Sequence, residues 1–394
     1  MAWRAEAVMG RALTIGMVAG EASGDLLGAA LIGALREHSP DMHFIGLSGE
    51  RMRAAGCESL GDSEELAVMG LVEPLRHLPR LLRLRSRLRQ EFLRRRVDVF
   101  IGVDAPAFNL GLARSLKRRG LATVQYVSPQ VWAWRPGRVP AIAAAVDAVL
   151  CLLPFEPGCY AGHAVRAEFV GHPLADQIPT ESQRASARQA LGLNDSDCVI
   201  AILPGSRMGE VQRLGADFAA AARLLSAATD RPVVFLAPMA SPAVAAVFEA
   251  QRRAVGVEIR LLQQGADQVL AAADAALVAS GTATLQSLLH GCPMAVAYRL
   301  APLTAFLVRS LKLVRLRHFS LPNLLAGEEL VQEFFQQDVR PAALAASLQR
   351  LLTDATGNAA MRRRFDDIHR LLRRNAAARA ARVVLELGAA RAAA

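Results

Sequence analysis

Short, wholly apolar runs recur along this chain, and each is followed by a turn containing glycine or proline and then by a longer helix-forming stretch. A strand that is apolar on both faces has to be covered on both faces, as in a parallel sheet flanked by helices. The runs therefore predict an α/β fold with parallel sheets. We expect strands at residues 13–18, 43–47, 97–103, 122–127, 146–152, 168–170, 199–203, 233–237, 258–262, 275–279 and 294–298.

A polar, proline-containing stretch at residues 171–198 interrupts this alternation once. A chain of 394 residues is also too long for one ordinary hydrophobic core. We therefore expect two domains, residues 1–180 and 181–341, followed by a helical tail over residues 342–394 that is rich in Ala, Arg and Leu.

The composition restricts the partners and the chemistry. The formal net charge is +10, and only two of the 46 basic residues, Lys117 and Lys312, are lysines. A basic surface attracts phosphate groups on nucleotides, lipids or nucleic acids, and charge alone does not distinguish among these three partners. The five cysteines are scattered without a CxxC pair, which favours a reducing compartment and argues against a disulfide framework. No residue spacing suggests a metal site, so we expect neither a metal nor a cofactor.

The N-terminus superficially resembles an export signal, because Arg4 and Arg11 precede a short apolar run. Acidic residues follow directly, at the place where small residues would precede a cleavage site. We therefore expect a buried first strand and a cytoplasmic protein. The longest apolar segments contain Asp147 and Asp274, so no membrane-spanning helix is expected.

The segment "LPGSR" links a predicted strand to a predicted helix. Free backbone N–H groups and the helix dipole at such a turn favour an anion. Gly205 would let the backbone approach a ligand closely, Ser206 can cap the helix, and Arg207 carries a forked donor suited to phosphate. The alternative is an ordinary capped helix whose arginine faces solvent.

A second turn of the same kind lies in "ASGTATLQ". Its small residues Ser280, Gly281 and Thr282 could hold a phosphate by their backbone amides, or could simply cap a helix. Ligands of open parallel sheets bind at the carboxyl ends of strands, where both turns are expected. The pair therefore favours a phosphate-binding site.

The segment "GEASGD" follows the first strand and contains Gly20, Glu21, Ser23, Gly24 and Asp25. A dinucleotide cofactor would require a GxGxxG pattern, which is absent. The segment could shape a pocket, or its glycines could serve close helix–strand packing.

Asp104 stands at the end of a strongly apolar strand in "GVDAPAFNL". A carboxylate at the mouth of a sheet is partly desolvated, as a general base should be. The alternative is a cap for the helix that begins near Pro106.

The segment 75–96 carries nine arginines, and its apolar Leu78, Leu82, Leu88 and Phe92 recur at roughly helical spacing. This pattern is typical of a helix on a membrane surface, and equally of a surface helix that docks on a sheet.

The aromatic segment 126–139 could line a cleft or pack between domains. We interpret "DSD" at Asp195–Asp197 as a turn and not as a metal clamp.

Eight motifs together resemble those of bacterial lipid-A-disaccharide synthases, in order from about Leu13 to Glu329. They are "GEASGD", "GVDAPAFNL", "YVSPQVWAWRPGRV", "LPFE", "FVGHPLAD", "LPGSR", "ASGTATLQSLLHGCPMAVAYR" and "LPNLLAGEE". The resemblance implies the GT-B architecture: two Rossmann-like domains facing across a cleft, the first on the acceptor side and the second binding the nucleotide-sugar, with C-terminal helices that cross back to the first domain.

The resemblance also implies an activity. UDP-2,3-diacylglucosamine would be joined to 2,3-diacylglucosamine 1-phosphate with inversion, giving the β-1,6-linked lipid A disaccharide and UDP. Because both substrates carry acyl chains, the enzyme would work peripherally at the inner-membrane surface, with segment 75–96 as the contact and no nucleic acid as partner. The oligomeric state, including a homodimer, stays open.

Residue roles follow from the same resemblance. Asp104 would be the base, Arg207 and Asn323 would serve the diphosphate, and "GEASGD" would help form the acceptor side. Two positions depart from the family pattern: Ala107 and Gln286 stand where the family usually has Asp and Glu. The second position holds the nucleotide ribose in such enzymes, so the loss of charge predicts weaker nucleotide binding.

Two other functions are compatible with parts of the sequence. A UDP-sugar 2-epimerase of the same fold would need no acyl-tolerant cleft. A basic lipid- or nucleic-acid-binding protein would leave the phosphate turns and Asp104 unexplained.

Overall fold

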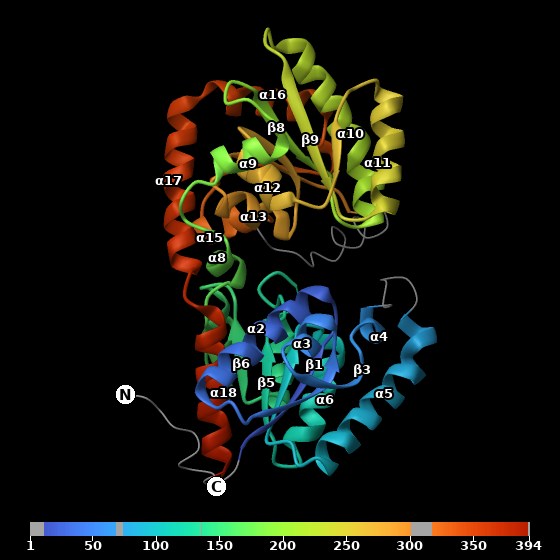
Figure 1. Ribbon diagram of the computed structural model, residues 1–394, viewed down its shortest axis with the longest axis vertical. Helices are drawn as coiled ribbons and strands as arrows, with labels where there is room; N and C mark the ends of the chain where they lie inside the picture. Colours follow the sequence, from blue (N-terminus) through green and yellow to red (C-terminus); the bar gives the residue numbers. More distant parts are fainter. Residues whose placement is uncertain (1–11, 68–73, 135, 301–316, 393–394) are drawn as a thin grey trace. The chain divides into compact units, whose positions relative to one another are not determined.

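The computed structural model describes residues 12–67, 74–134, 136–300 and 317–392 (Figure 1). The chain divides into two compact units, the first formed by Met1–Asp176 together with Leu372–Ala394 and the second by Gln177–Leu371. Domain limits at residues 180 and 341 stay predictions. The tail expected over 342–394 does not form a unit of its own, because its first part belongs to the second unit and its last part to the first.

The first unit contains a seven-stranded sheet in the order β3-β2-β1-β4-β5-β6-β7, with every neighbouring pair parallel. The strands are β1 (Thr14–Ala19), β2 (His43–Ser48), β3 (Cys57–Asp62), β4 (Val99–Val103), β5 (Ala122–Tyr126), β6 (Ala148–Cys151) and β7 (Arg166–Phe169). The helices up to the end of this region are α2 (Ala22–His38), α3 (Glu50–Ala54), α4 (Glu64–Ala67), α5 (Pro74–Arg94), α6 (Pro106–Lys117), α7 (Val139–Ala145) and α8 (Pro173–Gln177), with 3-10 turns at Pro136–Arg138 and Glu156–Tyr160.

The second unit contains a six-stranded parallel sheet in the order β10-β9-β8-β11-β12-β13. The strands are β8 (Cys198–Leu203), β9 (Val233–Met239), β10 (Arg260–Gln263), β11 (Ala275–Ala279), β12 (Met294–Tyr298) and β13 (Gln332–Phe335). The remaining helices among the described residues are α9 (Arg184–Leu191), α10 (Met208–Ala228), α11 (Pro242–Val255), α12 (Ala266–Ala272), α13 (Thr282–Leu289), α15 (Leu321–Ala326), α16 (Pro341–Thr353), α17 (Ala355–Leu372) and α18 (Ala376–Ala392), with a 3-10 turn at Gln336–Asp338.

The expected α/β fold with two parallel sheets is confirmed, and each of the strands expected from the sequence is present. The structure adds β3 and β13, which the sequence analysis missed. Both lie at a sheet edge and mix polar with apolar residues, reading "CESLGD" and "QEFF". An edge strand is covered on fewer sides than a central one, so it does not need the continuous apolar run of a central strand. The sequence did indicate the other two edge strands, β7 and β10.

An aspartate precedes a central strand three times, and each makes the same pair of contacts with the neighbouring strand. Its carboxylate accepts a backbone N–H of that strand at 2.8–2.9 Å, and its own N–H donates to the carbonyl of the same residue at 2.8 Å. The pairs are Asp98 with Thr14, Asp147 with Thr123, and Asp274 with Val199. The reciprocal bonds fix the strand register at the amino edge of each sheet.

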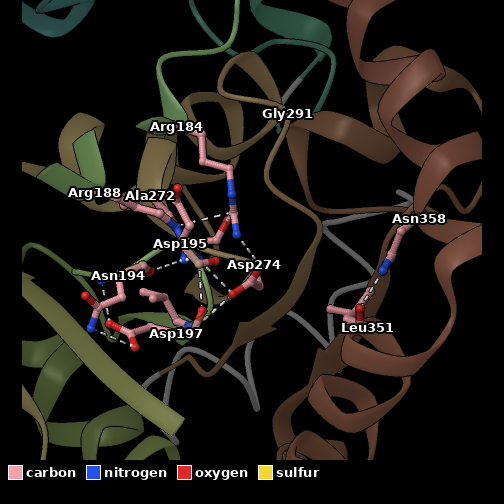
Figure 2. A network of polar contacts seen from close by, with 12 residues as sticks. Arg184, Arg188, Asn194, Asp195, Asp197, Ala272, Asp274, Gly291, Leu351 and Asn358 are labelled. Carbon is pink, nitrogen blue, oxygen red and sulfur yellow. Dashed lines mark hydrogen bonds and ion pairs between the residues drawn. The ribbon is translucent and has the colours of Figure 1, made fainter. Parts of the chain in front are cut away.

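In the second unit this edge also contains a fully buried arginine, Arg188 of α9, which is 1% exposed (Figure 2). It donates to the carboxylate of Asp274 and to four backbone carbonyls, those of Asn194, Asp195, Asp197 and Ala272. The loop that carries Asp195–Asp197 is thus a turn held by the arginine. The interpretation of "DSD" as a turn is confirmed.

The last helix completes the core of the first unit. One face of the first sheet is covered by α2 and α18, whose Leu31, Leu35, Val383 and Val384 are fully buried with strand residues such as Ile15. Figure 1 shows α18, in red, beside α2, in blue. The expectation that C-terminal helices return to the first domain is confirmed. On the opposite face the core is built by α5, α6 and α7.

The helix α5 divides into two parts with different environments. Leu88 and Phe92 are fully buried against the first sheet, whereas Leu78 and Leu82 are 47% and 44% exposed. Docking on the sheet therefore accounts for the carboxyl-terminal half of the expected apolar stripe only. Within the part of the chain that the structure describes, no helix combines the length and hydropathy that a membrane crossing requires.

Candidate active site

The segment "LPGSR" forms the turn between β8 and α10. Gly205 has φ +130°, and a Cβ there would lie 2.5 Å from the Cβ of Glu210, so glycine is required both by conformation and by space. The Glu210 carboxylate accepts the backbone N–H groups of Ser206 at 3.0 Å and Arg207 at 3.2 Å. The Glu210 carboxylate thus occupies the backbone amides that we expected to hold a phosphate. The Arg207 side chain is 76% exposed, with its guanidinium 3.6 Å from Glu210.

The segment "ASGTATLQ" forms the turn between β11 and α13. Gly281 has φ +150° and, like Thr282, is exposed, while the Ser280 hydroxyl donates to the carbonyl of Phe319. Because β8 and β11 are adjacent in the sheet, pairing at Leu203 and Val278, both turns lie side by side at its carboxyl edge. The structure thus brings the two expected phosphate turns together.

Gln286 of α13 donates through its amide to the carboxylate of Asp267 at 3.2 Å, and His290 contacts the same oxygen at 3.1 Å. The bond from His290 lowers the pKa of Asp267, against the effect of burial. A glutamate at position 286 would face this carboxylate directly. The expected contact of Gln286 with the nucleotide ribose stays a prediction.

Asn323 of α15 is fully buried, and its side-chain amide is hydrogen-bonded to backbone groups. Its amide donates to the carbonyl of Val331 at 2.9 Å and accepts the N–H groups of Leu330 and Val331 at 2.8 Å. A direct contact with a diphosphate would require Asn323 to give up these bonds. Its expected role at the diphosphate stays a prediction, and the geometry supports an indirect one, in which Asn323 ties α15 to β13.

In the first unit, Asp104 immediately follows β4 with φ +51°, and Ala105 has φ +39°. Left-handed backbone at a non-glycine residue costs on the order of 1–3 kcal/mol and recurs at functional sites. Burial raises the pKa of the Asp104 carboxyl, the Ala105 N–H opposes the rise, and the charge of Glu21 adds to it. The carboxylate is therefore a stronger base than an ordinary aspartate.

The segment "GEASGD" lies directly against this turn, because a Cβ on Gly20 would be 2.6 Å from the Cβ of Ala105. Glu21 and Ser23 are exposed, and Gly24 is buried. Asp25 is also buried, and it accepts the backbone N–H groups that start α3, those of Gly49, Arg51 and Met52. The structure thus gives Asp25 a structural contact, and its expected contribution to the acceptor side stays a prediction.

The aromatic segment after β5 is tied to a buried glutamate. Glu156 of "LPFE" is 3% exposed and accepts the N–H groups of Leu152 and Leu153 and the indole N–H of Trp132. Burial raises the pKa of Glu156 to about 7, although these donors oppose the rise. The Trp132 ring packs edge-on against Phe155 with centroids 5.3 Å apart.

Sequence reasoning missed three polar side chains at these turns: Glu210, Asn109 and Gln125. Asn109 and Gln125 are buried and donate to the carbonyl of Asp104. A polar amide inside an apolar helix face or strand was the available signal, since such residues are seldom buried without a partner.

Among the described residues, no three His, Cys, Asp or Glu side chains are grouped as metal ligands would be.

Two Rossmann-like parallel sheets with strand-to-helix turns at their carboxyl edges define the GT-B class. In agreement, the fold is similar to that of CalG4, a calicheamicin glycosyltransferase, with a TM-score of 0.58 and 17% identity over 96% of this chain and 98% of that chain. It is also similar to the UDP-GlcNAc 2-epimerase from Neisseria meningitidis, with a TM-score of 0.63 and 11% identity over 95% of this chain and 99% of that chain. These likenesses show the fold alone.

Sequence comparison identifies the family. The model of the family described as lipid-A-disaccharide synthetase matches residues 15–384. The lipid-A-disaccharide synthase of Sodalis glossinidius is 50% identical over 380 residues, covering 96% of this chain and 98% of the relative. The chain belongs to the lipid-A-disaccharide synthase family.

Proposed function

We propose that this chain is the glycosyltransferase that joins two acylated glucosamine units into the lipid A disaccharide. Family membership over nearly the whole chain is the observation that carries this function. The donor would be UDP-2,3-diacylglucosamine, the acceptor 2,3-diacylglucosamine 1-phosphate, and the products the β-1,6-linked disaccharide and UDP. The epimerase alternative has only a distant structural likeness in its favour.

The paired turns of the second unit support a donor site. As the anomeric bond breaks, the UDP leaving group gains negative charge that has to be stabilised. We assign this task to the backbone amide at Gly281, to the amide of Ser206 once the diphosphate displaces the Glu210 carboxylate from it, and to the exposed guanidinium of Arg207, with Gln286 beside the ribose. Loss of one such donor typically lowers kcat by about 10²–10³-fold. Arg207→Met should show this loss, and Arg207→Lys should recover only part of it.

Asp104 supports the acceptor side in the first unit. The acceptor's 6-hydroxyl attacks the anomeric carbon, the carbon–oxygen bond to the diphosphate breaks, and the hydroxyl proton passes to the Asp104 carboxylate. A single displacement of this kind inverts the anomeric centre. General bases contribute about 10²–10⁴-fold, so Asp104→Asn should lose turnover on that scale while binding UDP normally.

The test is a direct assay with both acylated substrates, with and without EDTA, in which the disaccharide is identified by mass spectrometry. Disaccharide formation that survives chelation supports stabilisation of UDP by protein groups. Turnover of the UDP-sugar without an acceptor would favour the epimerase instead. Full activity of Asp104→Asn would remove the base assignment while leaving the family and the fold untouched.

The exposed part of α5 supports a peripheral contact with the inner-membrane surface, on the cytoplasmic side. Leu78 and Leu82 lie one helical turn apart with arginines around them, a combination that suits anionic lipid. Replacing both by Asp should abolish co-flotation with vesicles of anionic phospholipid. Leu224→Asp is the matched control, because Leu224 is 37% exposed on α10. Equal losses in both variants would contradict this contact. The oligomeric state, including a homodimer, stays open, and sedimentation can determine it.

A further inference from the structure

The backbone turn at Asp104 is strained and must be held by its surroundings. Two consecutive non-glycine residues, Asp104 and Ala105, have φ of +51° and +39°. Such conformations persist only where other contacts enforce them. Alanine has no side-chain polar group that could compensate locally. The contacts that enforce the turn should therefore be found around its backbone.

The backbone of Asp104 is fully occupied. Its N–H donates to the carbonyl of Tyr126 at 2.8 Å. Its carbonyl oxygen accepts two side-chain amides, Asn109 Nδ2 at 2.8 Å and Gln125 Nε2 at 2.9 Å. A carbonyl oxygen has two lone pairs, so these two amides saturate it. Asn109 reaches it from α6 and Gln125 from β5, which places a donor on each side of the turn.

Both amides occupy unfavourable positions. Asn109 and Gln125 are 0% and 1% exposed, and their amide oxygens have no hydrogen-bond partner among the described residues. The amides cannot be reversed, because the polar atoms around their nitrogens are all carbonyl oxygens, including those of Val18 and Val127. An orphaned buried acceptor destabilises the fold, so folding stability alone does not explain why both residues are amides.

The neighbouring strand is also adapted to one of them. A Cβ on Gly102 would lie 2.7 Å from the Cβ of Asn109, so glycine in β4 makes room for this side chain. The unfavourable burial of both amides and the space that Gly102 leaves for Asn109 have one explanation in common. Both amides are placed to donate to the carbonyl oxygen of Asp104.

We propose that Asn109 and Gln125 are positioning residues that hold the Asp104 turn, and with it the catalytic carboxylate, in its reactive orientation. The inference rests on the proposed function, in which Asp104 is the base. Neither amide touches substrate; each acts through the main chain of Asp104. When an amide is removed, the turn relaxes toward ordinary backbone geometry and the carboxylate moves away from the acceptor hydroxyl.

The first experiment replaces each amide by leucine, which is apolar and has as many side-chain heavy atoms as asparagine and one fewer than glutamine. Asn109→Leu and Gln125→Leu should each lower kcat by about 10- to 100-fold, as misplacement of a reacting group does. The KM values for both substrates should stay within roughly threefold, because binding groups are unchanged. The melting temperature should change little, since removal of the orphaned oxygen offsets the bond lost at the Asp104 carbonyl, which keeps its other amide donor.

The matched control lies at the opposite end of the same strand. Thr123 of β5 is fully buried, and its hydroxyl bonds to Asp147 at 3.0 Å. Thr123→Val should lower the melting temperature and leave kcat unchanged. If Asn109→Leu behaves as this control does, its role is structural and the inference is wrong.

The second experiment keeps the test decisive if a leucine variant folds poorly. In the Asp104→Asn background, Asn109→Ala should cause no further loss of the residual kcat, because it acts through the group already removed. An independent, multiplicative loss would overturn the inference. An inactive Asp104→Asn together with a fully active Asn109→Leu would refute the positioning role alone, whereas an active Asp104→Asn would refute the base assignment itself.

Discussion

Replacement of the buried Arg188 by methionine should destabilise the second unit selectively. Methionine keeps much of the side-chain volume but removes all the donors of the guanidinium. The carbonyls of Asn194 and Asp195 belong to exposed residues and can bind water instead, so their loss contributes little. The carbonyl of Asp197 lies deeper and loses its partner, whereas the carbonyl of Ala272 loses one bond and keeps a second from Arg184 at 3.3 Å.

The magnitude follows from these contacts. The stranded carbonyl of Asp197 costs about 1–3 kcal/mol, and the bonds lost at Ala272 and at Asp274 cost about 1 kcal/mol each. The Asp274 carboxylate loses one partner but keeps Arg184 at 2.6 Å and the N–H of Val199 at 2.8 Å. The sum is about 4 kcal/mol, in the range for removing one member of a buried pair. For a unit of this size each kcal/mol lowers the melting temperature by about 2–4 °C, so a fall of about 8–16 °C is expected.

The chain offers its own reporters and control for this measurement. The sequence of Gln177–Leu371 contains no tryptophan, and Trp132 and Trp134 lie in the first unit, so tryptophan emission does not follow the second unit whereas far-ultraviolet circular dichroism reports both. Arg184→Met is the matched control, because the Arg184 side chain is 37% exposed and its ion pair should contribute only about 0.5–1 kcal/mol. Equal melting temperatures for the two variants, or an equal shift of tryptophan emission and circular dichroism, would refute the reasoning.

Three further predictions concern charge. Because burial raises the pKa of Glu156 to about 7, its contribution to the free energy of unfolding is complete below the pKa of an unfolded glutamate and is lost as pH rises through about 7. Urea denaturation should show a decline of about 3 kcal/mol from this group between pH 4 and 8, absent in Glu156→Gln. Glu21→Gln removes a charge that raises the pKa of Asp104, so the acid limb of the pH–kcat profile should move to lower pH. Gln286→Glu should tighten UDP-sugar binding in calorimetry, less so as pH falls and the carboxylate facing Asp267 takes up a proton; unchanged affinity at every pH would contradict a ribose contact at this position.

The central strands could be predicted from the sequence because burial on both faces leaves an uninterrupted apolar run. The edge strands β3 and β13 could not, since they are only partly covered and mix polar with apolar residues. The phosphate-type turns were visible for the same local reason: glycine, small residues and a strand before a helix stand next to one another in the chain.

The partners of these turns come from elsewhere in the sequence. Nothing local shows that Asp25 starts α3, that Asn323 binds the backbone of residues 330–331, or that Gln125 reaches the carbonyl of Asp104. Such contacts depend on which strands become neighbours, and a single sequence does not contain that order. The distinction between a side chain that faces substrate and one that supports the backbone is therefore made by tertiary structure.

The return of α18 to the first sheet has a consequence for synthesis on the ribosome. The chain emerges from its N-terminus, yet one face of the first sheet is completed only by Ala376, Val383 and Val384, near the opposite end. All of Gln177–Leu371 is translated in between, which at about 5–20 residues per second takes roughly 10 to 40 seconds. The segment made first is thus finished last, and the second unit can fold while an apolar face of the first still awaits its final helix.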